Sequence, residues 1–263
     1  MADYKRLLNR FNFKGQFIEL THQELQRRIK RFTSEGEYNH MLVALKVFCN
    51  WAIKRRYIEH NPTLGLSTHA TKPRSRVLTD AEIKLIWYAS DDTELPEHFR
   101  TIVKLLVLTG QRRGEIAALH TSYIDGNTCL LPAELTKNSR PHLFPLGPVA
   151  LSLLSPLTAS QKRLIFPARG KINSCFNGWS KSKTRLDLMS GVTDWTLHDL
   201  RRTFRTGLGQ LGVEPHIAER LVNHISSQSQ MERVYDQYKY IPEMKAAIGL
   251  WEVKIQSLLL PRA

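Results

Sequence analysis

The chain has 263 residues, of which 42% are hydrophobic, so it can bury the core of one large domain or two smaller ones. Its net charge of +14 predicts a polyanionic partner, nucleic acid in the first place and an anionic membrane in the second. A membrane role is disfavoured because no apolar run approaches the ~18–20 residues of a spanning helix. The first residues lack an apolar signal region, and three widely separated cysteines suggest neither a disulfide framework nor a zinc site. We therefore expect a cytoplasmic protein with reduced thiols.

Residues 1–66 are predicted to form a helical unit. Thr21 and Glu24 have the spacing of a capping box, and a longer helix is expected over residues 39–57 from its apolar three-to-four spacing. Residues 1–75 hold 14 Lys and Arg against 6 Asp and Glu, more than half of the excess positive charge of the chain. Such a charge run is often only a solvated face, but on a compact helical unit it indicates a grip on the DNA backbone. The polar, basic stretch 67–77 is predicted to be a linker that can lie along DNA.

A second domain is expected over residues 78–263, and it begins with helices. Thr79 and Glu82 form a second capping-box pattern, and a further helix is predicted from about residue 97 to 108. Gly110 is expected to stop that helix.

The periodicity then changes from helix to strand. Residues 123–131 predict a hairpin around an Asp-Gly turn, and residues 135–146 predict a second pairing whose bend carries Lys137. Helices resume after Pro148. The expected fold class is therefore mainly α with a small antiparallel β-sheet.

The stretch 196–235 concentrates the polar residues that suggest chemistry. If the segment is helical, His198 and Arg201 share one face, Gly212 closes the helix and Pro215 opens the next.

The second of these helices is expected to deliver His224 at its end, and Tyr235 follows eleven residues later. Two histidines, an arginine and a tyrosine suggest a phosphate that is held by donors and attacked by a phenol. Beyond them, an amphipathic helix from Pro242 is expected to pack on its own domain, with docking into a neighbouring subunit as the alternative.

An ordered set of motifs runs through the second domain: Thr109-Gly110-x-Arg112-x-x-Glu115, then Lys137, then His198-x-x-Arg201, then His224 and Tyr235. In this order and spacing the chain resembles the tyrosine recombinases, the phage-integrase family of site-specific DNA recombinases. The resemblance covers nearly the whole chain. It implies a helical core-binding domain at residues 1–66 and a tyrosine-recombinase catalytic domain at residues 78–263.

The resemblance assigns four residues to the phosphate and its support. Arg112 and Arg201 match the paired arginines that clamp the scissile phosphate, and His224 matches the His or Trp that donates to it. Glu115 matches the acidic residue that supports the active site. Where the family often has Gly before the second histidine, this chain has Asn223.

The remaining assignments concern proton transfer and attack. Lys137 matches the hairpin lysine that acts as general acid towards the leaving 5′-oxygen, and His198 matches the histidine that assists proton transfer at the nucleophile. Tyr235 matches the nucleophile, with Tyr238 and Tyr240 as the alternatives. His120, His142 and His216 are expected to be structural.

The chemistry of these residue types agrees with the resemblance. Planar guanidinium groups can neutralise the charge that builds on non-bridging phosphate oxygens, so two arginines and histidine donors can replace metal ions. No Asp/Glu cluster in the sequence suits Mg²⁺, and we expect no metal and no cofactor. A phenol has a reference pKa of about 10 and needs nearby cations or a base to become a nucleophile.

The expected function is thus a metal- and ATP-independent integrase-like enzyme of a phage or other mobile genetic element, which cuts and rejoins DNA through a 3′-phosphotyrosine. Two alternatives stay open: a non-catalytic, architectural DNA-binding protein on the same scaffold, and a type IB topoisomerase-like or dimer-resolving enzyme. The expected partners are double-stranded DNA, clamped between the two domains, and further copies of the chain in a tetramer on paired sites. The C-terminal helix could link the protomers, accessory DNA-bending proteins are compatible with this function, and the protein would be associated with a bacterial nucleoid.

Overall fold

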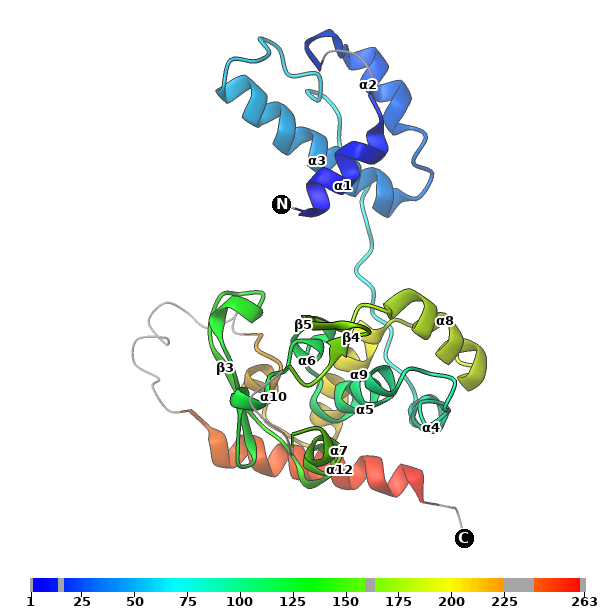
Figure 1. Cartoon of the computed structure of the whole chain (residues 1–263), viewed down its shortest axis with the longest axis vertical. Coiled ribbons are helices and arrows are strands. Elements are labelled where there is room, and N and C mark those ends of the chain that lie inside the picture. The colour runs from blue at the N-terminus through cyan, green and yellow to red at the C-terminus, as the bar shows by residue number, and fades with distance from the viewer. Residues whose placement is uncertain (1, 14–16, 159–163, 225–238, 261–263) are drawn as a thin grey trace. The chain divides into compact units, whose positions relative to one another are not determined.

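The computed structural model describes residues 2–13, 17–158, 164–224 and 239–260. The chain divides into two compact units, Met1–Arg74 and Ser75–Ala263, each with its own set of packed elements (Figure 1). The division falls inside the basic stretch 67–77. None of the helices in these ranges is long and apolar enough to cross a membrane.

The N-terminal unit is built from helices: α1 (Ala2–Phe11), the 3₁₀ turn η1 (Phe17–Glu19), α2 (His22–Ile29) and α3 (Glu35–Lys54). The predicted cap of α2 is present, since the Thr21 side chain accepts a hydrogen bond from the backbone N–H of Glu24 at 3.2 Å. The Glu24 carboxylate does not return to Thr21 but pairs with Arg27 and Arg28. α3 starts earlier and ends earlier than predicted; Arg56 has a left-handed φ of 59° just after its end.

The helices of the C-terminal unit surround α5, whose residues from Ile102 to Thr109 are all buried. Apart from Lys104 and Thr109 this stretch is apolar, and a helix with apolar residues on all its faces belongs at the centre of a domain. Both halves of the predicted capping box at Thr79 and Glu82 are present at the start of α4. The helices are α4 (Asp80–Ala89), α5 (Glu97–Thr109), α6 (Arg113–Ala117), α7 (Pro148–Thr158), α8 (Trp179–Ser190), α9 (Leu197–Gln210), α10 (Pro215–Leu221) and α12 (Ile241–Leu259).

A three-stranded antiparallel sheet interrupts these helices, in the order β1 (Ile124–Asp125), β2 (Thr128–Leu131), β3 (His142–Pro145). The first predicted hairpin is confirmed. The pairing predicted within residues 135–146 is wrong, because β3 returns against β2 and their last pair joins Leu131 to His142. Pro132 lacks an N–H and ends β2, and Ala133–Leu135 form a 3₁₀ turn instead of a strand.

The structure also contains a second hairpin, β4 (Pro167–Ala168) with β5 (Lys171–Cys175), that sequence reasoning missed. The fold is nevertheless mainly α with small antiparallel sheets, as expected.

The C-terminal helix α12 packs on its own unit, as predicted. The indole Nε1 of Trp251 donates to the carbonyl of Val107 at 2.9 Å, and the buried Glu252 carboxylate accepts from the N–H groups of Val149 and Ala150. Those two N–H groups belong to the first turn of α7, so Glu252 caps α7 from another helix.

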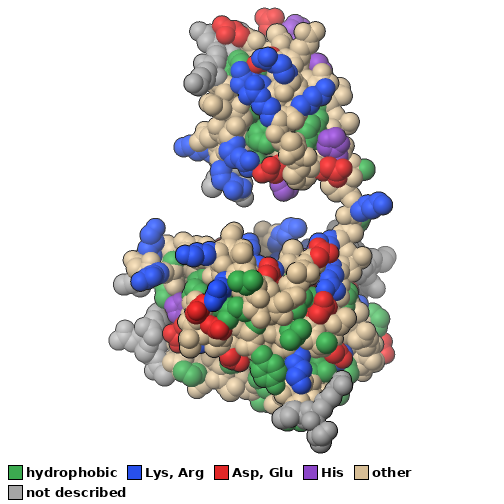
Figure 2. Space-filling view, turned by 90° about the vertical axis from the view of Figure 1, so that its right-hand side faces the viewer, with side chains coloured by type: hydrophobic (Ala, Val, Ile, Leu, Met, Phe, Trp, Pro, Cys, Tyr) green, Lys and Arg blue, Asp and Glu red, His purple; other side chains and the backbone are tan. Residues whose placement is uncertain are grey.

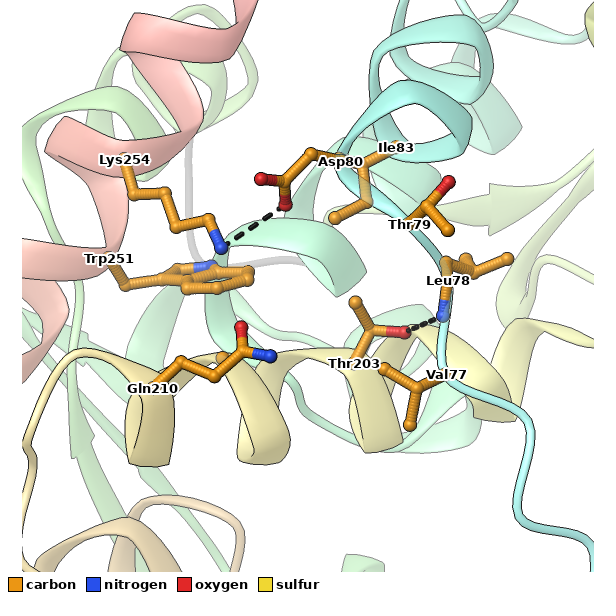
Figure 3. A pocket seen from close by; sticks show the side chains of 10 residues that line it. Val77, Leu78, Thr79, Asp80, Ile83, Thr203, Gln210, Trp251 and Lys254 are labelled. Atoms are coloured by element: carbon orange, nitrogen blue, oxygen red, sulfur yellow. Dashed lines mark hydrogen bonds and ion pairs between the residues drawn. The ribbon is translucent and has the colours of Figure 1, made fainter.

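A cavity of about 300 Å³ lies between α12, α9 and the beginning of the C-terminal unit, and Figure 3 shows side chains that line it. Lys254 pairs with Asp80 at 3.1 Å, and the Leu78 N–H donates to the Thr203 hydroxyl at 2.9 Å. None of the residues proposed for chemistry lines this cavity. Its contacts hold the start of the unit against the helix that carries His198 and Arg201.

Candidate active site

Arg112 lies in the turn between α5 and α6. Gly110 ends α5 in the left-handed region (φ 62°), and Arg112 is the N-cap residue of α6. The buried Glu115 carboxylate accepts hydrogen bonds from the Arg112 backbone N–H at 3.1 Å and from its Nη1 at 2.7 Å. The Arg112 side chain keeps 20% of its surface exposed, so part of its guanidinium is fixed by Glu115 and part faces outward.

Arg201 lies on α9 and is almost completely buried, with 2% of its surface exposed. Its Nη1 donates to the carbonyl of Gly110 at 3.0 Å, and its Nη2 donates to the carbonyl of Val222. Its Nε has no hydrogen-bond partner among the described residues. Burial lowers the pKa of Arg201 to about 10, and the positive charge of Arg112 is the next largest cause of this shift. A buried cation beside a second cation is unfavourable unless an anion joins them.

His198 lies one turn before Arg201 on the same helix, as the sequence predicted. Burial lowers its pKa, and the charges of Arg202 and Arg201 lower it further. The ring is therefore mostly neutral at pH 7, because even its unperturbed pKa is about 6.5. A neutral imidazole can accept a proton, so the chemistry of His198 suits a base.

His224 lies three residues beyond the end of α10. The start of that helix at Pro215 agrees with prediction, and so does the burial of Ile217, Ala218, Leu221 and Val222. Its Nδ1 lies 3.2 Å from Oε2 of Glu219, and Glu219 also accepts from Nε of Arg205 at 2.7 Å. Burial and the charge of Arg201 lower the pKa of His224, while Glu219 raises it. The carboxylate holds the ring by one nitrogen and leaves the other for a ligand.

The structure brings these groups within range of one another's charges. Arg112 lowers the pKa of Arg201, and both arginines lower the pKa of His198 and of His224. Lys137 is exposed in the loop that follows β2, and the next residue, Asn138, hydrogen-bonds to Asn223 beside His224. The described members of the set therefore belong to one neighbourhood, with Lys137 at its edge.

The sequence was compared with known proteins, and residues 76–240 match the model of the phage integrase family. The chain belongs to that family. It is 29% identical over 164 residues to the tyrosine recombinase XerC of Xylella fastidiosa (strain M23), covering 59% of this chain and 55% of that protein. It is 27% identical over 203 residues to the tyrosine recombinase XerD of Ralstonia nicotianae, covering 71% of this chain and 64% of that protein. It is 26% identical over 218 residues to the prophage integrase IntZ of Escherichia coli K12, covering 80% and 53%.

The chain thus spans between about half and two thirds of the length of these relatives. Among solved structures, it resembles a lambda integrase (75–356) dimer bound to a COC′ core site, with a TM-score of 0.64 at 20% identity over 90% of this chain and 89% of that one. A lambda integrase tetramer bound to a Holliday junction gives a TM-score of 0.63 at 19% identity, over 88% and 73%. At this identity the likeness shows the fold.

The tyrosine expected to be the nucleophile of this integrase-family chain, Tyr235, lies outside the described residues, as does the alternative Tyr238. Tyr240 is described. Its ring packs on α10, 5.3 Å from the His216 ring and 4.4 Å from the Arg220 guanidinium carbon. Tyr240 therefore has a packing role at the start of α12.

Three polar residues support the site of this family member; His142 was expected to be structural, and sequence reasoning missed the other two. Nε2 of the buried His142 donates to Oε1 of the buried Gln111 at 3.1 Å, and Nε2 of Gln111 donates to the carbonyl of Leu221 at 2.8 Å. The third is Glu219, the partner of His224. Gln111 stands inside the Thr109–Glu115 motif, but its residue type alone does not indicate a buried bridge.

Within the ranges that the structure describes, no group of three or more His, Cys, Asp or Glu side chains is arranged to hold a metal ion. The three cysteines are free, and burial raises the pKa of the Cys49 thiol to about 11 and of Cys129 to about 12. Cys175 is exposed.

Proposed function

We propose that this chain is a site-specific DNA recombinase of the integrase type, which cuts and rejoins double-stranded DNA through a 3′-phosphotyrosine intermediate. The observation that carries the proposal is the Arg112–Arg201 pair, in which the buried Arg201 guanidinium has no ion-pair partner among the described residues and lies within range of the charge of Arg112. A phosphodiester is the anion that fits such a pair, because its non-bridging oxygens match the planar donors of guanidinium groups.

In the proposed reaction, Arg112 and Arg201 bind the non-bridging oxygens and stabilise the charge that develops on them. Neutral His198 accepts the phenol proton of Tyr235 as the phenol oxygen attacks phosphorus. The bond to the 5′-oxygen breaks, and Lys137 supplies a proton to that oxygen, which leaves as a 5′-hydroxyl. The 3′-phosphotyrosine keeps the energy of the broken bond, so a second strand's 5′-hydroxyl can reverse these steps without ATP.

His224 has a defined proton requirement in this proposal. A hydrogen bond from Nδ1 to the Glu219 carboxylate requires a proton on Nδ1, and donation to a phosphate oxygen requires a second proton on Nε2. The ring therefore acts as an imidazolium. Burial and the charge of Arg201 lower the pKa of His224, so the ring becomes an imidazolium only when the charge of a bound phosphate adds to that of Glu219 and raises the pKa again.

The proposed partner is duplex DNA, and the basic N-terminal unit supports it. Figure 2 shows Lys and Arg side chains gathered on that unit, which holds 14 of these residues in positions 1–75. Assembly as a tetramer on two paired sites is part of the proposal, since a lambda integrase of the same fold forms a tetramer on a Holliday junction. Because neutralised phosphates release counterions, binding should weaken steeply as salt is raised.

The deciding experiment traps the covalent adduct. A pool of nicked duplexes with random core sequences is incubated with the protein, so that cleavage near the nick releases a short 5′-hydroxyl fragment that diffuses away and prevents religation. Slow-migrating protein–DNA species on a denaturing gel are recovered and sequenced. The wild type should form the adduct in the presence of EDTA, and Tyr235→Phe should not.

Two variants serve as controls for that experiment. Tyr238→Phe should trap DNA like the wild type, and Arg201→Ala should bind the selected duplex but cleave very slowly. An adduct with Tyr235→Phe and none with Tyr238→Phe would move the nucleophile to Tyr238. No adduct with any duplex would leave a non-catalytic DNA-binding protein as the better function, and relaxation of supercoiled DNA without two-site recombination would indicate a topoisomerase-like enzyme.

A further inference from the structure

The turn that presents His224 has the geometry of a Schellman motif. The His224 N–H donates to the carbonyl of Glu219 at 2.9 Å, and the Asn223 N–H donates to the carbonyl of Arg220 at 3.0 Å. Asn223 occupies the left-handed position of this motif, with φ 53°. Glycine is the usual residue there, and asparagine is the commonest substitute, so the backbone alone does not require an asparagine side chain.

The side chain of Asn223 makes a contact that glycine cannot make. Its Oδ1 accepts from Nδ2 of Asn138 at 2.8 Å, and its Nδ2 lies 3.4 Å from Oδ1 of Asn138. Asn223 is 2% exposed, so this amide pair is shielded from water on one side. Asn138 follows Lys137 directly, and Asn223 precedes His224 directly. The pair joins two segments 85 residues apart, each next to a residue proposed for chemistry.

The same two segments are also joined at the base of the loop. His142 begins β3, where the loop re-enters the sheet, and through Gln111 it is connected to the carbonyl of Leu221 in the last turn of α10. The loop is also braced internally, because the Thr136 hydroxyl donates to the carbonyl of Arg140 and accepts from the Arg140 backbone N–H. The loop is therefore fixed to the end of α10 both at its base and at its tip.

We propose that Asn138 and Asn223 are positioning residues, whose amide pair holds Lys137 at the working distance from the scissile phosphate. The inference rests on the proposed function, since Lys137 is the acid whose place the pair would define. Without the pair, Lys137 would stand on an exposed loop held only at its base, and it would spend less time near the leaving oxygen. Phosphate binding by the arginines would not change, because the hydrogen bonds of the Asn138 and Asn223 side chains join them to each other, and those of Arg112 and Arg201 go to Glu115, Gly110 and Val222.

The test separates proton donation from every other step. Single-turnover cleavage is measured on the duplex selected by covalent trapping, with either the natural 5′-oxygen or a bridging 5′-sulfur at the scissile position. A thiol has a pKa of about 8.5, so a thiolate leaves without a proton from Lys137. Asn138→Ala and Asn223→Gly remove the amide pair, and glycine keeps the backbone conformation of the Schellman turn.

Both variants should cut the oxygen duplex roughly tenfold more slowly than the wild type, a fraction of the ~10²–10⁴-fold that a missing general acid costs. Both should cut the sulfur duplex at the wild-type rate and bind DNA normally. The double variant should be no slower than either single variant, because one contact is lost in all three.

An equal slowing on both duplexes would overturn the proposal, because the pair would then affect folding or phosphate binding. Wild-type rates on the oxygen duplex would overturn it as well. Lys137→Ala is the reference variant. If the sulfur duplex restores the cleavage rate of Lys137→Ala but not the rates of the asparagine variants, only this inference is refuted. If the wild type forms no adduct on either duplex, the proposed function itself fails. Asn138→Ala, on an exposed loop, keeps the test valid if Asn223→Gly does not fold.

Discussion

Replacing Gly110 by alanine should destabilise the C-terminal unit for two independent reasons. The residue has φ 62°, a conformation that costs an L-residue with a Cβ about 1–2 kcal/mol. A Cβ would also lie 2.3 Å from Cδ1 of Phe204 in the packed core, and overpacking of this kind costs about 1–3 kcal/mol. Together the two effects predict a loss of roughly 2–5 kcal/mol.

The assay is thermal unfolding followed by circular dichroism. For a domain of this size, each kcal/mol shifts Tm by about 2–4 °C, so Gly110→Ala should lower Tm by roughly 4–20 °C. Because the Gly110 carbonyl accepts from Arg201, DNA cleavage should also fall at temperatures where the variant is folded. Gly114→Ala is the matched control: it has no atom within 4 Å of its Cβ and no left-handed φ, so it should keep or slightly raise Tm. Equal Tm values for the two variants would refute the reasoning.

Three further predictions concern buried polar groups. Glu252→Ala should lower the free energy of unfolding in urea by about 3 kcal/mol, since two N–H groups of α7 lose a charged acceptor, and Glu252→Gln should cost less because one acceptor remains. Burial lowers the pKa of His142 to about 3, and the charge of Arg201 is the next largest cause. Between pH 6.5 and pH 3 the unfolded chain therefore binds a proton at His142 that the folded chain does not bind. The free energy of unfolding should fall by about 1.4 kcal/mol for each pH unit from pH 6.5 towards pH 3. A urea series in which His142→Phe keeps the full slope would contradict this. Glu115→Gln should slow single-turnover cleavage roughly tenfold with unchanged DNA affinity, because the residue orients Arg112 without touching substrate; a change in affinity alone would argue against that role.

The sequence alone was sufficient for the features that depend on a few neighbouring residues. The N-cap at Thr21, the capping box at Thr79, the helix stop at Gly110 and the Gly212–Pro215 boundary all lie where they were expected; the second half of the box predicted at Thr21 is absent, because Glu24 pairs with Arg27 and Arg28. Caps and left-handed turns are decided within one helical turn, where side-chain and backbone geometry leave few options. The spacing of His198 and Arg201 on one helical face follows from the same local geometry.

The strand pairing and the support of the site were decided only in the folded chain. A strand can pair with any segment of suitable pattern; β3 pairs with β2, which ends at Leu131 as predicted, and not with residues 133–135, which form a 3₁₀ turn. The Gln111–His142 bridge and the Asn138–Asn223 pair join residues 31 and 85 positions apart. Their residue types do not reveal their partners.

The protonation states of the two histidines also depended partly on the sequence and partly on the folded structure. Residue type showed that His198 and His224 could titrate near neutral pH, but the direction of each shift required burial and the nearby arginine charges. Local backbone preference thus determined where this chain turns and which side chains it presents. Packing determined which of those side chains meet and what charge they carry, because burial and Coulomb interactions depend on groups that are distant in sequence.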